Sequence, residues 1–207
     1  KLGGEQMPAD FAAAYGLRWT ALRYFNAAGA DPEGELGEEH DPETHAIPLA
    51  IRAALALGPA FTLMGDDYPT PDGSAVRDYV HVCDLADAHV RAAEYLIAGG
   101  ANIALNLGTR KGTSVLEILD AVRLARGRPP PLVRGPRRAG DPPCLYACAD
   151  RARAVLRWAP RFASIAETVR TAAIWFQQEQ SSRGAEERNL YGCGVEHAVR
   201  EVRRRRH

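Results

Sequence analysis

One feature of this sequence constrains its fold more than any other: short apolar runs alternate with amphipathic helical patterns. Four runs are typical of strands: Trp19–Phe25, Phe61–Met64, Asp78–Val82 and Ile103–Leu107. Five segments have helical patterns: Glu5–Tyr15, Pro48–Leu57, Asp84–Ala98, Ser114–Gly127 and Ser164–Phe176. Strands that alternate with helices of this length predict an α/β architecture.

Local signals predict where several helices begin. Ser114 and Ser164 each precede a Glu by three residues, which is the spacing of a capping box. Asp84 is expected to cap the helix that follows the third strand. Pro8 suits a first helical turn better than a helix middle, because its ring removes a backbone donor.

Polar segments separate these elements. The two segments Asp31–Thr44 and Gly65–Ala75 are rich in Gly, Pro and acidic residues, and loops of this length usually serve function. Asn26–Ala30 is expected to end the first strand. The composition changes near Glu179, so residues 179–207 are expected to form a disordered tail. The run Arg203–Arg206 fits such a solvated tail better than a nucleic-acid patch.

The overall composition excludes several classes of partner. Lys and Arg total 26, as do Asp and Glu, so the formal net charge is zero, which argues against nucleic acid or an anionic membrane surface. No apolar stretch approaches the roughly 18–20 residues that cross a bilayer. The 4 cysteines are too few for a disulfide scaffold in 207 residues, so reduced thiols and a cytoplasmic location are expected.

Two groups of side chains suit a phosphorylated ligand. Arg77 follows one polar loop, and Arg138 lies with Asp141 in another. Guanidinium groups at such places bind phosphates in a bidentate manner, although a surface ion pair between Arg138 and Asp141 is the alternative. Tyr24–Asn26 ends a strand, where open α/β sheets bind ligands, although the two aromatic rings also suit core packing.

Other catalytic signatures are absent from the sequence. His40, His45, His81 and His89 lack the regular spacing of a metal site, so no bound metal is predicted. No glycine-rich phosphate loop and no serine nucleophile elbow is present. The residues alone therefore predict an α/β domain that binds something phosphorylated.

Several longer runs carry a resemblance to a known family. They are Leu22–Ala30, Gly65–Val82, Asp84–His89, Asn106–Thr109 and Arg137–Pro142. The most specific part is the pattern Asp-Tyr-Pro-Thr-x-Asp-Gly within the second run. These runs closely resemble the UDP-glucose 4-epimerases, a branch of the extended short-chain dehydrogenase/reductases within the NAD-dependent epimerase/dehydratases, up to about Phe176.

The resemblance implies a domain organisation. Family members have an N-terminal Rossmann domain that binds NAD and a smaller C-terminal α/β domain that binds a UDP-sugar. Residues 1–30 would then be the C-terminal remainder of the Rossmann domain, and residues 31–178 a UDP-sugar-binding domain with interleaved Rossmann elements. A homodimer is implied for the full-length enzyme.

The resemblance also implies a mechanism and a missing part. In the family a Tyr-x-x-x-Lys pair lies on one helix face, and the Tyr takes a proton from the sugar 4-hydroxyl while hydride passes to NAD. The Lys lowers the pKa of that Tyr. Lys1 matches this Lys, so the Tyr would fall four positions earlier. We therefore expect the chain to be a C-terminal portion that lacks the Tyr and the NAD glycine loop.

Further site residues follow from the resemblance, residue by residue. Cofactor binding is implied for Lys1, Tyr24 and Phe25. Substrate binding is implied for Asn26, His45, Ala46, Thr62, Leu63, Met64, Arg77, Arg138, Asp141 and Leu145. Within this set the two arginines would neutralise the diphosphate, and residues 62–64 would line the uridine. His45 stands where Asn is more usual, and Leu145 where a bulkier Tyr excludes N-acetylated sugars.

The expected activity is the NAD-dependent interconversion of UDP-glucose and UDP-galactose through a 4-keto sugar. One alternative is a closely related 4-epimerase that acts on UDP-arabinose or a UDP-N-acetylhexosamine. A second alternative is a non-catalytic UDP-sugar-binding remnant. Product analysis with a panel of UDP-sugars distinguishes the enzymes from one another, and upstream coding sequence distinguishes them from a remnant.

Overall fold

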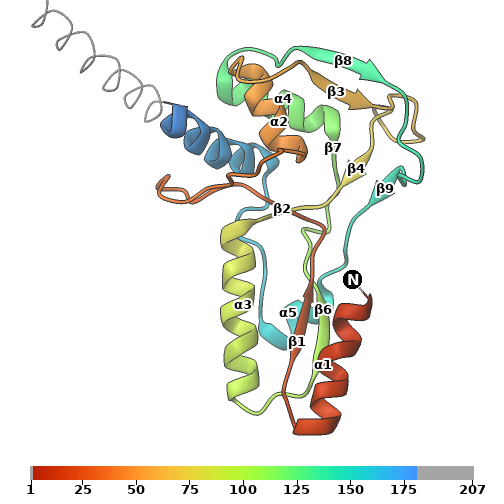
Figure 1. Ribbon diagram of the computed structural model, residues 1–207, viewed down its shortest axis with the longest axis vertical. Helices are drawn as coiled ribbons and strands as arrows, with labels where there is room; N and C mark the ends of the chain where they lie inside the picture. The colour runs from red at the N-terminus through yellow and green to blue at the C-terminus, as the bar shows by residue number, and fades with distance from the viewer. Residues whose placement is uncertain (1, 181–207) are drawn as a thin grey trace, which may run out of the picture.

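Residues 2–180 of the chain are described by a computed structural model with two lobes along its long axis (Figure 1). Each lobe has a buried apolar cluster of its own. Most strand pairs are parallel, and helices pack against them. This arrangement confirms the predicted α/β class.

The lower lobe in Figure 1 is built on one pair of parallel strands. These strands are β1 (Thr20–Arg23) and β6 (Ile103–Asn106), with Thr20 opposite Ile103. The helices of this lobe are α1 (Leu2–Tyr15), α3 (Val82–Ile97) and α5 (Asp150–Leu156). Leu105, Leu107 and Trp158 are fully buried in its core.

The upper lobe packs three helices against a second parallel pair. Its elements are α2 (Ala46–Ala54), α4 (Val115–Arg126), the helix over residues 165–180, β3 (Phe61–Met64) and β8 (Leu132–Gly135). Ile51, Ile118 and Val122 are fully buried between these helices. The apolar residues of α2 and of α4 recur every three or four positions, so each helix has one apolar face that it buries in this packing.

Short strands join the two lobes. β2 (Asn26–Ala28) pairs in parallel with β5 (Tyr79–His81). β4 (Val76–Arg77) lies between β7 (Thr113–Ser114), which is antiparallel to it, and β9 (Cys144–Leu145), which is parallel. The chain therefore crosses between the lobes at several points, and the polar segment over residues 31–44 leaves from this junction (Figure 1).

A buried histidine helps to hold the junction together. The Nδ1 atom of His81 accepts a hydrogen bond from the Cys83 backbone N–H at 3.2 Å, so the proton is assigned to Nε2, which donates to Thr171 Oγ1 at 3.0 Å. The ring stacks on Phe162 with centroids 4.1 Å apart. Burial lowers the pKa of His81. The neutral imidazole thus links β5 to the helix over residues 165–180.

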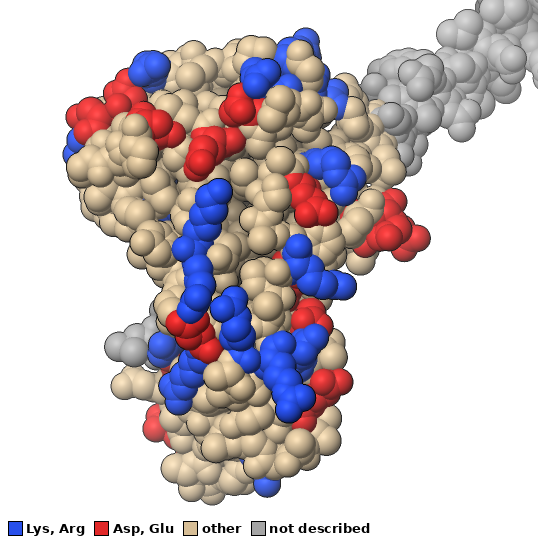
Figure 2. Space-filling view, turned by 180° about the vertical axis from the view of Figure 1, so that it is seen from behind, with Lys and Arg blue, Asp and Glu red and all other residues tan. Residues whose placement is uncertain are grey.

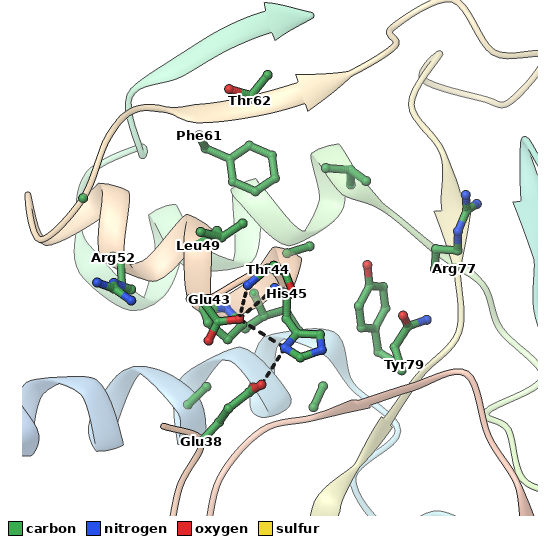
Figure 3. Close-up of a pocket in the computed structure, with 18 of the residues that line it drawn as sticks. Glu38, Glu43, Thr44, His45, Leu49, Arg52, Phe61, Thr62, Arg77 and Tyr79 are labelled. Atoms are coloured by element: carbon green, nitrogen blue, oxygen red, sulfur yellow. Dashed lines mark hydrogen bonds and ion pairs between the residues drawn. The ribbon is translucent and has the colours of Figure 1, made fainter. Parts of the chain in front are cut away.

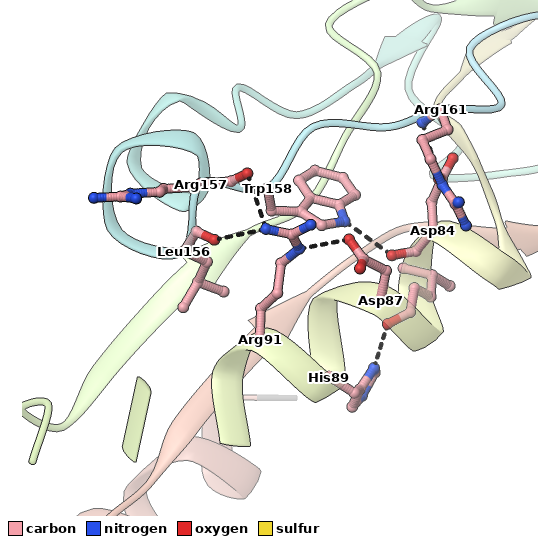
Figure 4. A network of polar contacts seen from close by, with 9 residues as sticks. Asp84, Asp87, His89, Arg91, Leu156, Arg157, Trp158 and Arg161 are labelled. Carbon is pink, nitrogen blue, oxygen red and sulfur yellow. Dashed lines mark hydrogen bonds and ion pairs between the residues drawn. The ribbon is translucent and has the colours of Figure 1, made fainter. Parts of the chain in front are cut away.

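The start of α3 holds a second polar network (Figure 4). The buried carboxylate of Asp84 accepts hydrogen bonds from the backbone N–H groups of Arg161 at 2.9 Å and Phe162 at 3.0 Å. Its carbonyl accepts from Trp158 Nε1 at 2.9 Å. The prediction that Asp84 caps α3 is therefore wrong: His81 is the N-cap, and Asp84 binds a distant loop instead.

Other local predictions had mixed outcomes. The capping box at Ser114 is confirmed, with Ser114 Oγ accepting from the Glu117 N–H at 3.0 Å. Pro8 lies inside α1 instead of in its first turn. The first strand ends at Arg23, before Asn26, and Asn26 begins a second short strand, β2, instead of an irregular segment. Of the predicted tail, residues 179–180 continue the last helix, and 181–207 lie outside the described residues.

The surface is mixed in charge. Figure 2 shows Lys and Arg side chains gathered over the waist and lower lobe of one face, with carboxylates between them. Among residues 2–180, no helix has the length and apolar character needed to span a membrane.

Candidate functional site

A cavity of about 660 Å³ opens in the upper lobe beside the junction. Its walls come from β2, the loop before α2, the first turns of α2, β3, β4 and β5, the segment between β8 and β9, and the last helix (Figure 3). Predicted site residues that line it are Asn26, His45, Ala46, Thr62, Met64, Arg77, Arg138 and Asp141. The structure thus brings together eight of the predicted residues from distant parts of the sequence.

Two arginines and one carboxylate form one charged group in the wall of the cavity. Arg77 Nη2 lies 3.7 Å from Asp141 Oδ2, and Arg138 Nη2 lies 3.1 Å from the same oxygen. The Arg77 side chain is only 15% exposed, and its Nη1 donates to the Val76 carbonyl at 2.8 Å. The ion pair of Arg138 with Asp141 therefore exists, and it lies in the cavity wall. Taken by themselves, these three side chains carry one net positive charge, which suits a bound phosphate. Arg52, Glu38, Asp41 and Glu43 also line the cavity.

Polar groups of β2 and β5 form the wall beside these arginines. Asn26 Nδ2 donates to the Asp78 carbonyl at 2.8 Å, which fixes the orientation of the amide. Burial raises the pKa of Tyr79 to about 12, against the opposing effect of the nearby Arg77 and Arg138. The Tyr79 phenol therefore stays protonated at neutral pH and can donate a hydrogen bond to a ligand.

Strand β3 supplies an apolar wall. Thr62 and Met64 line the cavity, whereas Leu63 is 1% exposed and belongs to the opposite face of the strand. The alternation of side chains along a strand explains why Leu63 differs from its two neighbours. Leu63 can therefore offer a ligand its backbone, but the structure does not bring its side chain into the cavity. Phe61, at the start of the strand, also lines the cavity, and sequence reasoning missed it.

His45 lies at the start of α2 and is held by two carboxylates (Figure 3). Its Nδ1 atom is 2.6 Å from Glu38 Oε1 and 3.1 Å from Glu43 Oε1. Glu43 Oε1 also accepts from the backbone N–H groups of Thr44 and His45, each at 2.7 Å. Sequence reasoning missed Glu38, Glu43 and Tyr79, because nothing in their spacing marks them.

Three predicted residues lie elsewhere, and a fourth is not among the residues that the structure describes. Lys1 lies outside the described residues. Tyr24 packs against the lower core, with its ring in a T-shaped contact with His89, and Phe25 is 41% exposed beside it. Leu145 pairs with Arg77 through β9 but is not part of the cavity wall.

The loop before β4 is shaped by its own side chains. Asp72 Oδ1 accepts from the Ser74 N–H and hydroxyl, at 2.9 and 2.8 Å. Gly73 has φ +81°, and a Cβ there would lie 2.2 Å from the Asp66 carbonyl oxygen. Asp78, fully buried, accepts from the N–H groups of Thr109 at 3.1 Å and Ala147 at 3.0 Å. These residues do not line the cavity; their hydrogen bonds hold the segment that carries Arg77 in place.

Comparison with known sequences identifies the family. A sequence model of the NAD dependent epimerase/dehydratase family matches residues 1–108, which is more than half of the chain. The chain belongs to this family. The matched residues include the strands β1 to β6.

Individual relatives are similar over most of the chain. A UDP-glucose 4-epimerase of Rhizobium leguminosarum bv. trifolii is 54% identical over 83% of this chain and 52% of that protein. One of Lacticaseibacillus casei is 47% identical over 89% of this chain and 56% of that protein. The chain therefore spans about half the length of the curated relatives it matches.

Solved structures give the same result. A UDP-glucose 4-epimerase from Brucella ovis in complex with NAD has a TM-score of 0.81 and 52% identity, over 83% of this chain and 53% of that chain. The enzyme from Bifidobacterium longum in complex with NAD+ and UDP has a TM-score of 0.79 and 36% identity, over 86% and 53%. The epimerase/dehydratase fold of this chain is thus shared with enzymes crystallised with NAD.

Proposed function

We propose that this chain forms the UDP-sugar-binding part of an NAD-dependent UDP-glucose 4-epimerase. The observation that carries the proposal is the cavity in which Arg77 and Arg138 face the apolar strand β3. A nucleoside diphosphate needs both features, because its phosphates are anionic and the faces of its flat base pack against apolar side chains. Relatives at about half-identical sequence are UDP-glucose 4-epimerases, which supports this choice of nucleotide.

Each polar group of the cavity has a role in the proposal. Arg77 and Arg138 bind the diphosphate, and Asp141 orients both guanidinium groups and accepts from the ribose. Thr62, Met64 and the backbone of Leu63 bind the uracil ring. Asn26, His45 and Ala46 contact the sugar and the adjacent phosphate. The neutral Tyr79 phenol is an additional donor toward the sugar.

The residues proposed to bind NAD lie at the carboxyl end of a strand. Tyr24 and Phe25 follow β1, and ligands bind open α/β sheets at the carboxyl ends of their strands. The exposed ring of Phe25 offers an apolar surface there. NAD, when bound, accepts the hydride from the sugar C4 and returns it. Lys1 is proposed as the catalytic lysine that lowers the pKa of the family's tyrosine.

The proposal includes the assignment of chain segments. Residues 1–30 would belong to the NAD-binding domain and residues 31–178 to the UDP-sugar-binding domain with interleaved Rossmann elements. On this assignment the catalytic Tyr and the glycine loop are supplied by residues other than those of this chain. A cytoplasmic location and a homodimer are proposed for the whole enzyme.

Calorimetric titration of this chain with UDP tests the proposed site. UDP is expected to bind, UMP more weakly because it lacks the phosphate that meets the second arginine, and ADP more weakly because its base is larger. Equal affinity for UDP and ADP would contradict the proposed nucleotide. A UDP-glucose, UDP-arabinose and UDP-N-acetylglucosamine panel, assayed with the whole protein, then tests the choice among the 4-epimerases and the proposed role of Leu145.

A further inference from the structure

We propose that Glu38, His40, Glu43 and His45 form a binding site for a divalent transition-metal ion of the zinc class. The four side chains each offer one ligand atom, and these atoms all lie within 4.8 Å of one another. They come from the end of the long polar loop and the residue before α2. The proposal does not depend on the proposed function, because it rests on these four side chains alone.

The donor set selects the class of metal. Two imidazole nitrogens and two carboxylate oxygens suit Zn²⁺ and related ions, whereas Ca²⁺ and Mg²⁺ prefer oxygen ligands throughout. Two carboxylates also balance the charge of a divalent cation, so an occupied site is neutral. This balance lowers the cost of holding the ion beside a partly buried wall.

The geometry is already close to that of a four-coordinate site. Ligand atoms about 2.1 Å from a tetrahedral ion lie about 3.4 Å from one another. His45 Nδ1 is 2.6 Å from Glu38 Oε1 and 3.1 Å from Glu43 Oε1, and the rings of His40 and His45 have centroids 5.3 Å apart. The four ligand atoms lie within 4.8 Å of one another, so the widest separation exceeds the tetrahedral spacing by at most about 1.4 Å.

Glu43 provides the fixed part of the site. Its side chain is 3% exposed, and its hydrogen bonds to Thr44, His45 N–H and His45 Nδ1 all fall on Oε1. Among the described residues, the hydrogen bonds therefore leave Oε2 available to a cation. A carboxylate already ordered by backbone donors loses little side-chain entropy when it binds an ion.

An occupied site would fasten the loop to the start of α2. Glu38, Glu43 and His45 also line the cavity, so the cation would lie in its wall (Figure 3). The imidazole of His45 has two nitrogens, and one of them can bind the metal while the other remains available to a ligand.

Titration of the full, untagged chain with Zn²⁺ after treatment with a chelator tests the site. We expect one high-affinity Zn²⁺ ion per chain, and a loss of about tenfold or more in affinity in His40→Ala and in His45→Ala. Both side chains are exposed, so these variants are expected to fold normally, which circular dichroism verifies. The matched controls His89→Gln and Glu94→Gln, on α3, are expected to bind Zn²⁺ like the parent.

Co²⁺ substitution provides a second readout. A tetrahedral nitrogen and oxygen site gives intense visible d–d bands without the near-ultraviolet charge-transfer band of a thiolate ligand. The proposal predicts those d–d bands in the parent and their loss in His45→Ala. A thiolate band, binding that His40→Ala and His45→Ala leave unchanged, or the absence of high-affinity binding would overturn it.

Discussion

The two lobes are built from the same kinds of α/β elements, but they differ in how their polar side chains are paired. In the lower lobe, Trp158 and Asp84 are buried and hydrogen-bonded to each other's segment, so polar groups there are satisfied internally. In the upper lobe, Arg77 and Arg138 meet a single carboxylate at the wall of a cavity. The first arrangement stabilises the fold, and the second places two guanidinium groups in a cavity wall, where a ligand can contact them. Buried polar groups alone therefore do not locate a site; charged side chains that line a cavity do.

The largest expected effect concerns the lower lobe. Trp158→Ala removes a fully buried indole and the hydrogen bond to the Asp84 carbonyl, so we expect a loss of about 3–5 kcal/mol in unfolding free energy. Denaturant unfolding measures it. Val133→Ala, at an exposed position of β8, is the control and is expected to change stability by less than about 0.5 kcal/mol. Similar losses of unfolding free energy in the two variants would contradict the claim that the buried polar and apolar contacts of Trp158 stabilise the fold.

The next effect concerns ligand binding in the upper lobe. Arg138→Ala is expected to weaken UDP binding by about tenfold to a hundredfold, because it removes a charge-assisted hydrogen bond to phosphate. Arg134→Ala is a closely matched control, since both arginines are 64% exposed and paired with an Asp, but Arg134 does not line the cavity. Equal weakening in both variants, measured by calorimetry, would mean that general surface charge attracts the ligand.

A smaller effect distinguishes the two sequence matches to a capping box. Ser114→Ala is expected to cost about 0.5–2 kcal/mol in stability, because Ser114 Oγ accepts from Glu117 N–H and donates to Asp72. At Ser164 the hydrogen bonds given by the structure use its backbone carbonyl, so Ser164→Ala should cost only a few tenths of a kcal/mol. Thermal unfolding of both variants measures the difference. A larger loss at Ser164 would contradict this account.

The smallest effect is a pH dependence at the junction. Because burial lowers the pKa of His81, the unfolded chain binds a proton near the ordinary value of 6.5 while the folded chain does not. Stability should therefore fall as the pH decreases below about 6.5, and this part of the fall should be absent from His81→Gln. Unfolding free energies measured between neutral and mildly acidic pH test it. Equal slopes in parent and variant would assign the pH dependence to other groups.

Local sequence signals predicted much of the fold. The runs at Phe61–Met64 and Ile103–Leu107 became β3 and β6, and the signal at Ser114 predicted the start of α4. Two-residue strands such as β4 and β9 could not be predicted, because they form only where distant segments meet. The cap of α3 was misassigned to Asp84 for the same reason, since its partners lie more than seventy residues away.

The site was predicted in part. The resemblance pointed to Arg77, Arg138 and Asp141, and the structure places their side chains on one cavity. Tyr79 was missed because its cavity position depends on the register of β5 against β2. Glu38 and Glu43 were missed because an irregular loop brings them together, and no periodic spacing records such a loop.

Hydrogen–deuterium exchange of this chain with and without saturating UDP tests the central claim most directly, because it reports which lobe the ligand protects. The account predicts slower exchange in β3 and in the segment over residues 137–141, with β6 in the lower lobe unchanged. Protection confined to the lower lobe, or no protection in either lobe at saturating UDP, would contradict it.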